Sequence, residues 1–234
     1  HDVSFDLFQG EILGFSGMMG SGRSELMRLL FGADQKDSGE IYLRGSNTPR
    51  RIHSPKDAVN AGLAMLTEDR KAQGLLLPLS IAANISLAKM DAVSSRGWLH
   101  PSKEESVSKR YIKQLSIRCH SVDQRVKTLS GGNQQKVVMA KWLYTEPEIL
   151  IFDEPTRGID VGAKFEIYNL LKNLAREGRA IIVVSSDMLE LFAISDRIAV
   201  MSNGALANIF TRGDWSEDKI MQAALSNYMA GKAG

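Results

Sequence analysis

The sequence has little of what marks several other classes of protein. It holds a single cysteine, Cys119, so no disulfide can form within the chain, and we expect a reducing compartment. Its longest apolar runs, such as residues 149–152 and 180–184, are far shorter than the ~20 residues of a membrane-spanning helix. The formal net charge of +2 gives no strong attraction to nucleic acid. We therefore expect a chain without a nucleic-acid partner that is soluble, or held at a membrane by another protein.

What is present is typical of a folded globular protein. Hydrophobic residues make up 44% and charged residues 24% of the 234 positions, which excludes disorder as the main state. The 20 glycines and 6 prolines are too few for a low-complexity linker. The length fits one large domain or two small ones. The sequence opens at His1 and enters a strand-like segment at once, so we expect a fragment of a longer protein.

Strand-like and helix-like segments alternate along the chain. The expected strands cover residues 3–8, 11–16, 40–43, 63–67, 148–152, 180–185, 197–201 and 205–210. The expected helices cover residues 23–31, 56–61, 80–89, 102–115, 132–144, 161–177, 187–194 and 216–228. The continuous apolar runs at 149–152 and 181–184 are typical of parallel strands buried between helices.

These segments predict an α/β core with a helical subdomain. The early strands have glycines at their turns and predict a small antiparallel β region at the start of the chain. Residues 80–144 contain no convincing strand and are expected to form a helical insert. The core is then expected over residues 1–79 and 145–234.

A glycine-rich turn follows the strand that ends near Ser16. Residues 17–24 match the phosphate-loop pattern G-x-x-x-x-G-K-[ST], except that Arg23 replaces the lysine. In such a loop, backbone N–H groups surround a phosphate group, the next helix adds its positive end, and the Ser24 hydroxyl can bind Mg²⁺. The alternative is a tight strand-to-helix turn without a ligand. The candidate nucleotide-binding residues are Gly17, Met18, Met19, Gly20, Ser21, Gly22, Arg23, Ser24 and Glu25.

Two carboxylates end the apolar strand near residue 152. A buried parallel strand would deliver Asp153 to the edge of the sheet where ligands of such sheets lie. We expect Asp153 to hold Mg²⁺ and Glu154 to polarise the attacking water as a general base. The alternative is a pair of carboxylates that opens a turn before Pro155.

A second glycine motif, Leu129–Gln135, precedes the helix expected at 132–144. Ser130 is a good helix N-cap residue, and the simplest interpretation stops at that role. The sharper hypothesis is a second anion site, formed by the serine, the two glycines and the start of the helix. Because this motif lies on a different subdomain from the phosphate loop, it is free to serve a nucleotide held by another subunit.

The motif at 129–135 resembles the signature of ABC ATPases. The motif stands after the phosphate loop and before the acidic strand, and with this order of motifs the chain resembles an ABC ATPase domain over residues 3–203. The resemblance implies a P-loop NTPase fold, with ATP and Mg²⁺ as ligands. The stretch 153–164 resembles the second half of the tandem ATPases of bacterial monosaccharide importers for ribose, galactose, arabinose and xylose. The whole chain is then expected to be one ABC ATPase domain of a two-domain protein.

The resemblance also implies roles for single residues. Glu68 stands at the Q-loop glutamine position, as a candidate Mg²⁺ ligand, and Asp160 resembles the D-loop aspartate. Ser186 occupies the position of the switch histidine and cannot supply an imidazole. Arg23 keeps the charge of the usual lysine, but its guanidinium is broader. We therefore expect this chain's own nucleotide site to be weakened, although the general base Glu154 is present.

Partners follow from the same resemblance. ABC domains pair head to tail, so Ser130, Gly131, Gly132 and Asn133 are expected to complete the site of another ABC ATPase domain. Docking on an integral membrane permease is expected around residues 68–78 and 81–88, for which ordinary packing of the insert is an equal alternative. The resemblance places the protein at the cytoplasmic face of the membrane and links it indirectly to an external sugar-binding protein.

Two other functions compete with sugar import. The first is a regulatory nucleotide-binding module without hydrolysis, which Arg23 and Ser186 favour and Glu154 opposes. The second is a non-transport ABC ATPase of DNA repair or translation. The near-neutral charge and the compact insert argue against this second function.

Overall fold

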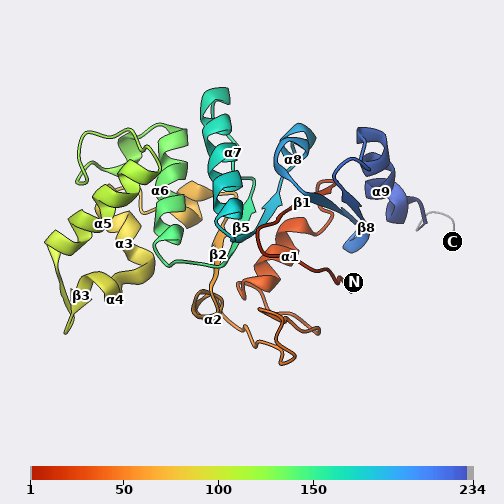
Figure 1. Ribbon diagram of the computed structural model, residues 1–234, viewed down its shortest axis with the longest axis horizontal. Coiled ribbons are helices and arrows are strands. Elements are labelled where there is room, and N and C mark those ends of the chain that lie inside the picture. The colour runs from red at the N-terminus through yellow and green to blue at the C-terminus, as the bar shows by residue number, and fades with distance from the viewer. Residues whose placement is uncertain (1, 231–234) are drawn as a thin grey trace. The chain divides into compact units, whose positions relative to one another are not determined.

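The computed structural model describes residues 2–230 and divides the chain into two compact units (Figure 1). The first unit contains residues 2–65, 148–154 and 171–230. The second contains residues 66–147 and 155–170. The second unit therefore includes the whole segment 80–144 together with residues on both sides of it.

The first unit is built on a six-stranded sheet with the strand order β2-β5-β6-β1-β7-β8. Its strands are β1 (Ile12–Gly17), β2 (Leu63–Leu66), β5 (Ile149–Asp153), β6 (Ala180–Val184), β7 (Arg197–Ser202) and β8 (Ala205–Thr211). β1 is parallel to β6 and β7, β5 is parallel to β6, and β8 is antiparallel to β7. Because parallel strands end at a common edge, the loops after β1, β5 and β6 share that edge.

Local signals set the helices of the first unit. These helices are α1 (Arg23–Leu30), α2 (Pro55–Asn60), α8 (Met188–Ile194) and α9 (Glu217–Ala230). Ser54 caps α2 by accepting a hydrogen bond from the N–H of Asp57, and Pro55 supplies the first helical position. Asp187 caps α8 in the same way, through the N–H of Glu190. α9 packs on β7, where the Ser202 hydroxyl donates to a carbonyl of the helix.

The second unit is mainly helical, and α3 (Ile81–Ser86) packs against both α5 (Pro101–Gln114) and α6 (Gly131–Leu143), as Figure 1 shows. Shorter helical segments are η1 (Arg70–Gly74), η2 (Leu87–Lys89), α4 (Met90–Val93) and η3 (Val126–Thr128). A two-stranded hairpin joins β3 (Ser94–Ser95) to β4 (Trp98–Leu99). α7 (Val161–Arg176) follows β5 in the chain.

The predicted α/β fold with a parallel sheet is confirmed, but the antiparallel β region lies elsewhere. Residues 3–8 and 40–43 form no strand, and the small antiparallel sheet is the hairpin of residues 94–99, inside the segment expected to lack strands. The alternation in 3–8 has a different cause. The Phe5 ring packs edge-on against the Phe15 ring, with 5.2 Å between the ring centroids. Every second side chain of this segment is thus partly buried, while its backbone pairs with no strand.

Within the described part of the chain, no helix is long and apolar enough to cross a bilayer.

A buried lysine in α6 gives the second unit a pH-dependent stability. Lys141 is 7% exposed, and its ammonium donates to the carbonyl of Gly74 at 2.6 Å. Burial lowers the pKa of Lys141 to about 8, from an ordinary value of 10.5. The folded state therefore loses this proton at a lower pH than the unfolded state does. The cost of the buried charge is fully present below pH 8 and disappears as the pH rises towards the unfolded pKa.

We expect the free energy of unfolding to rise with pH relative to a Lys141→Met variant. Between pH 7.5 and 10.5 the difference should shift by about 3 kcal/mol in favour of the unmodified chain. Urea unfolding of both proteins across this range measures the shift. A difference that stays constant with pH would contradict the assignment to Lys141.

Candidate functional site

Glycines with positive φ shape the turn between β1 and α1. Gly17 has a φ of 152°, and a Cβ there would lie 2.5 Å from the Met201 carbonyl oxygen and 2.6 Å from the Ser21 hydroxyl. Gly22 precedes the first turn of α1 in the left-handed region, with a φ of 92°. A side chain at either position would clash or strain the backbone, so the tight loop requires glycine.

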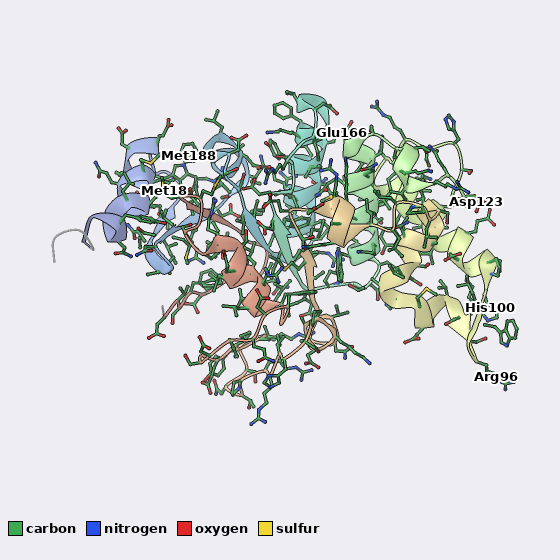
Figure 2. All side chains as sticks on the ribbon, turned by 180° about the vertical axis from the view of Figure 1, so that it is seen from behind. Met18, Arg96, His100, Asp123, Glu166 and Met188 are labelled. Carbon is green, nitrogen blue, oxygen red and sulfur yellow. The ribbon has the colours of Figure 1, made fainter. Side chains whose placement is uncertain are left out.

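The loop leaves polar groups without partners where a phosphate group would lie. The Ser21 hydroxyl is buried and makes no hydrogen bond. The first N–H groups of α1 have no partner within the helix, because the earliest helical bond runs from Leu26 to the Gly22 carbonyl. Met19 is 96% exposed, and Figure 2 labels its neighbour Met18 at this loop. The methionines therefore leave the backbone available to an anion, and the loop fits a nucleotide phosphate.

A hydroxyl and a carboxylate meet beside this loop. Ser24 lies in the first turn of α1, and its hydroxyl donates to Oδ1 of Asp153, the last residue of β5, at 3.1 Å. Burial raises the pKa of Asp153, while the Ser24 hydrogen bond opposes the rise. Among residues 2–230 no cluster of three or more His, Cys, Asp or Glu side chains could hold a metal. The Ser24–Asp153 pair fits Mg²⁺, which takes few protein ligands and fills the rest of its shell with phosphate and water.

Glu154 follows directly in a strained backbone conformation. Its φ is 49°, and its N–H donates to the Val184 carbonyl at 2.9 Å, which ties the turn to β6. Its Oε1 accepts a hydrogen bond of 2.7 Å from the backbone N–H of Ser186. The structure thus brings Glu154 and Ser186 together, but through the serine backbone. The carboxylate is half-buried and keeps a second oxygen for a water molecule.

Arg23 makes a contact that a lysine could not reproduce with the same geometry. Its Nη1 donates to the Ser185 carbonyl, just after β6, at 2.9 Å. The guanidinium therefore spans from α1 to a neighbouring strand end. This contact could not be predicted from the sequence, because the two residues lie 162 positions apart and the acceptor is a backbone atom.

The second glycine motif starts α6 in the second unit. Ser130 is at the N-cap, as predicted, but its side chain makes no capping bond to the backbone. Its hydroxyl instead accepts from Nδ2 of Asn133 at 3.0 Å, and Oδ1 of Asn133 accepts from the N–H of Arg118 at 2.8 Å. The capping role expected of the serine hydroxyl is therefore wrong, because Asn133 uses that oxygen. The first N–H groups of α6 are left for another acceptor.

The two glycines of the motif are closely packed within the second unit. A Cβ at Gly131 would lie 2.9 Å from Nη2 of Arg70 and 3.2 Å from the Gly158 carbonyl oxygen. A Cβ at Gly132 would lie 2.8 Å from Cβ of Ala163. A cavity of about 390 Å³ adjoins the motif. Its lining residues are Arg118, Cys119, His120, Gln124, Thr128, Leu129, Ser130 and Asn133.

The remaining predicted site residues, Glu68 and Asp160, also lie in the second unit. The Glu68 carboxylate forms an ion pair with Arg157, and its expected role as a Mg²⁺ ligand stays a prediction. Oδ1 of Asp160 accepts from the N–H of Ala163 at 3.0 Å, in the first turn of α7. The two units thus hold one cluster each. The first contains the phosphate loop with Asp153, Glu154 and Ser186, and the second contains the glycine motif with Glu68 and Asp160.

Comparison with known proteins gives these clusters a family context. The family model described as ABC transporter matches residues 1–157. The chain is 51% identical over 223 residues to "Ribose import ATP-binding protein RbsA 3" of Rubrobacter xylanophilus, which covers 95% of this chain and 44% of that protein. It is 48% identical over 223 residues to "Ribose import ATP-binding protein RbsA" of Geobacillus kaustophilus, covering 95% and 45%. The chain thus spans about half the length of the curated relatives it matches.

Solved structures agree on the fold. A nucleotide-free ATP-binding cassette from an ABC transporter aligns with a TM-score of 0.79 at 21% identity, over 94% of this chain and 90% of that one. A dimeric post-hydrolysis state of an ATP-binding cassette bound to ADP and Pi aligns with a TM-score of 0.76 at 21% identity, over 92% and 90%. At this identity the likeness concerns the fold, and it confirms the fold class expected from the sequence.

Proposed function

Because this chain belongs to the ABC transporter family, we propose that it binds ATP with Mg²⁺ and hydrolyses it to drive import of a monosaccharide through a membrane permease. The observation that carries this proposal is the meeting of Ser24, Asp153 and Glu154 beside a phosphate loop with partnerless polar groups. A purely structural turn would not need a buried carboxylate against a helix start.

Each group at the sheet edge has a role in this chemistry. The N–H groups of residues 22–24 at the start of α1 would hold the phosphates, and Ser24 with Asp153 would hold Mg²⁺, which would neutralise charge on the phosphate oxygens. In the hydrolysis, a water oxygen bonds to the terminal phosphorus as the bond to ADP breaks, and Glu154 takes the water proton. The Ser186 N–H orients the Glu154 carboxylate for that transfer.

We propose that the signature glycines act on the nucleotide of a different ABC domain. In a head-to-tail pair, the free N–H groups at the start of α6 would face the terminal phosphate held by the partner's phosphate loop. One structural neighbour, an ATP-binding cassette bound to ADP and Pi, is a dimer, which supports the pairing of such domains. The positions of Ser130, Gly131 and Gly132 at the start of a 13-residue helix supply the required donors.

The transport role rests on the relatives' names and on exposed apolar side chains. Leu76 and Leu87 are each more than 40% exposed and belong to the segments expected to dock on the permease, and the equally exposed Leu79 lies between these segments. We propose that this surface binds the permease at the cytoplasmic face of the membrane. An external sugar-binding protein would then act through the permease, and the sugar would be ribose or a related monosaccharide.

We propose that this chain's own site is weakened. The guanidinium of Arg23 is held by the Ser185 carbonyl, whereas a lysine ammonium is compact enough to follow the β- and γ-phosphates. Ser186 offers Glu154 a backbone N–H but has no imidazole with which to reach the terminal phosphate. A regulatory module that binds ATP without hydrolysis is the second candidate, and the Arg23 contact is the observation that favours it.

Nucleotide binding and turnover with Mg²⁺ test the proposal. We expect the chain to bind ATP in a Mg²⁺-dependent way and to hydrolyse it slowly. Arg23→Lys should raise turnover about tenfold, because a lysine frees the cation to stabilise charge in the transition state. Calorimetric binding and phosphate release measure both quantities. If the unmodified chain and Arg23→Lys both bind ATP without hydrolysing it, the regulatory module is favoured. If the unmodified chain does not bind ATP, the proposed nucleotide site is contradicted.

A further inference from the structure

Among residues 2–230, the Arg70 guanidinium forms no ion pair with a carboxylate, and its hydrogen bond goes to a backbone carbonyl. It is half-buried at the start of η1, and its Nε is buried without a hydrogen-bond partner. Burial lowers the pKa of Arg70, opposed by the charge of neighbouring Asp69. Oδ1 of Asp69 accepts hydrogen bonds from the N–H groups of Lys71 and Ala72, so the carboxylate is held against the start of η1. Burying part of a charged guanidinium costs free energy, so we expect the contacts of Arg70 to have a structural role.

The guanidinium lies against two loops of the same unit. Its Nη1 donates to the carbonyl of Arg157 at 2.9 Å. Its Nη2 lies 2.9 Å from the place where a Cβ of residue 131 would stand, and 3.9 Å from the corresponding place at Gly158. Gly131 therefore leaves room for the guanidinium as well as for the helix start. Any larger side chain there would displace Arg70 from the Arg157 carbonyl.

Arg157 is held a second time from the same segment. Its side chain pairs with the carboxylate of Glu68, while its backbone carbonyl receives the hydrogen bond from Arg70. Glu68 and Arg70, which flank Asp69, thus both contact Arg157, which lies 87 positions after Arg70. The other end of η1 is fixed as well, because Lys141 donates to the Gly74 carbonyl. The segment that makes these contacts is anchored at both ends.

We propose that Glu68 and Arg70 form a clamp on Arg157 that positions the loop 157–160 against the signature glycine Gly131. Arg70 is the central positioning residue, since its guanidinium contacts the Arg157 carbonyl and also lies beside Gly131. The clamp makes the signature and the loop with Asp160 one rigid surface. Its catalytic consequence rests on the proposed function, in which that surface completes a partner's ATP site.

Amide hydrogen exchange tests the clamp without nucleotide. In Arg70→Gln we expect exchange in residues 157–160 and 131–133 to quicken about tenfold, while exchange in residues 17–24 stays unchanged. Arg70→Lys should fall between, because one ammonium cannot span both contacts. Lys71→Gln, which removes a neighbouring exposed charge, is the matched control. Equal exchange in Arg70→Gln and Lys71→Gln would overturn the clamp, and so would faster exchange spread evenly over both units.

Turnover separates positioning from general stability. Glu68→Gln and Arg157→Ala cut the same ion pair, so each should lower kcat about threefold, and the double variant should fall no further. Arg70→Gln should lower kcat about tenfold and leave the KM for ATP unchanged. The double variant Glu68→Arg with Arg157→Glu exchanges the two charges, so it should keep the ion pair and regain the kcat that Glu68→Gln loses. A KM change without a kcat change would overturn the positioning role. Absence of turnover in the unmodified chain would contradict the proposed function alone, because the exchange result needs no ATP.

Discussion

Glu154→Gln is expected to lower ATP turnover by at least about a hundredfold while leaving ATP binding within about twofold. The glutamine amide is uncharged and cannot take the proton of the attacking water. Its oxygen can still accept the 2.7 Å hydrogen bond from the N–H of Ser186, so the side chain should keep its place. The positive φ of residue 154 is unaffected by the exchange, because both side chains branch alike beyond Cβ. The fold and the phosphate loop should therefore be unchanged.

Phosphate release and calorimetric ATP binding measure the two effects on the same preparations. Glu177→Gln, which removes an exposed carboxylate beyond the end of α7, is the matched control and should keep full turnover. If Glu154→Gln kept most of its turnover, another group would have to accept the proton, and the assignment of the general base would be wrong. If it lost ATP binding instead, the carboxylate would belong to the binding site.

The parts of this site that the sequence predicts are those made from contiguous residues. The phosphate loop is a strand, a glycine turn and a helix start in one stretch, so its pattern is legible in the chain order. Asp153 and Glu154 are equally easy to recognise, because an apolar strand that runs parallel to its neighbours ends at the same edge of the sheet as β1. The backbone conformation of the loop and the burial of the strand both depend on residue types within one short stretch, so both can be recognised in the sequence.

The features that could not be predicted are hydrogen bonds whose donor and acceptor lie far apart in the chain, and local patterns that more than one structure can produce. The serine at 130 has the right type for a cap, yet Asn133 takes its oxygen. Segment 3–8 alternates as a strand does, but alternation reports one buried face and not the presence of a neighbouring strand. The contacts of Arg23 and Arg70 end on carbonyl oxygens, which every residue carries, so no residue type marks the acceptor. Only the folded backbone identifies these partners.

Gly131→Arg is the second change with a large expected effect, and it acts on a different step. The new side chain would begin 2.9 Å from the Arg70 guanidinium and would cover the free N–H groups at the start of α6. We expect turnover to fall about a hundredfold, because the donors for the partner's terminal phosphate are lost. ATP binding to this chain's own phosphate loop should persist. Ser102→Arg, which adds the same charge at an exposed position of α5, should leave both properties intact.

Mixing the two inactive variants decides whether the signature acts across a pair of domains. In a head-to-tail pair of Glu154→Gln with Gly131→Arg, one site combines the intact phosphate loop and Glu154 of one chain with the intact signature of the other. The opposite site carries both defects. Because random pairing makes half of the pairs mixed, and each mixed pair has one complete site of two, turnover should recover to about a quarter of the original. Two chains whose sites each worked within a single subunit would show no recovery at all, since each would still carry its own defect. Recovery that grows with protein concentration would follow directly from pairing, so the same titration reports the association of the chains.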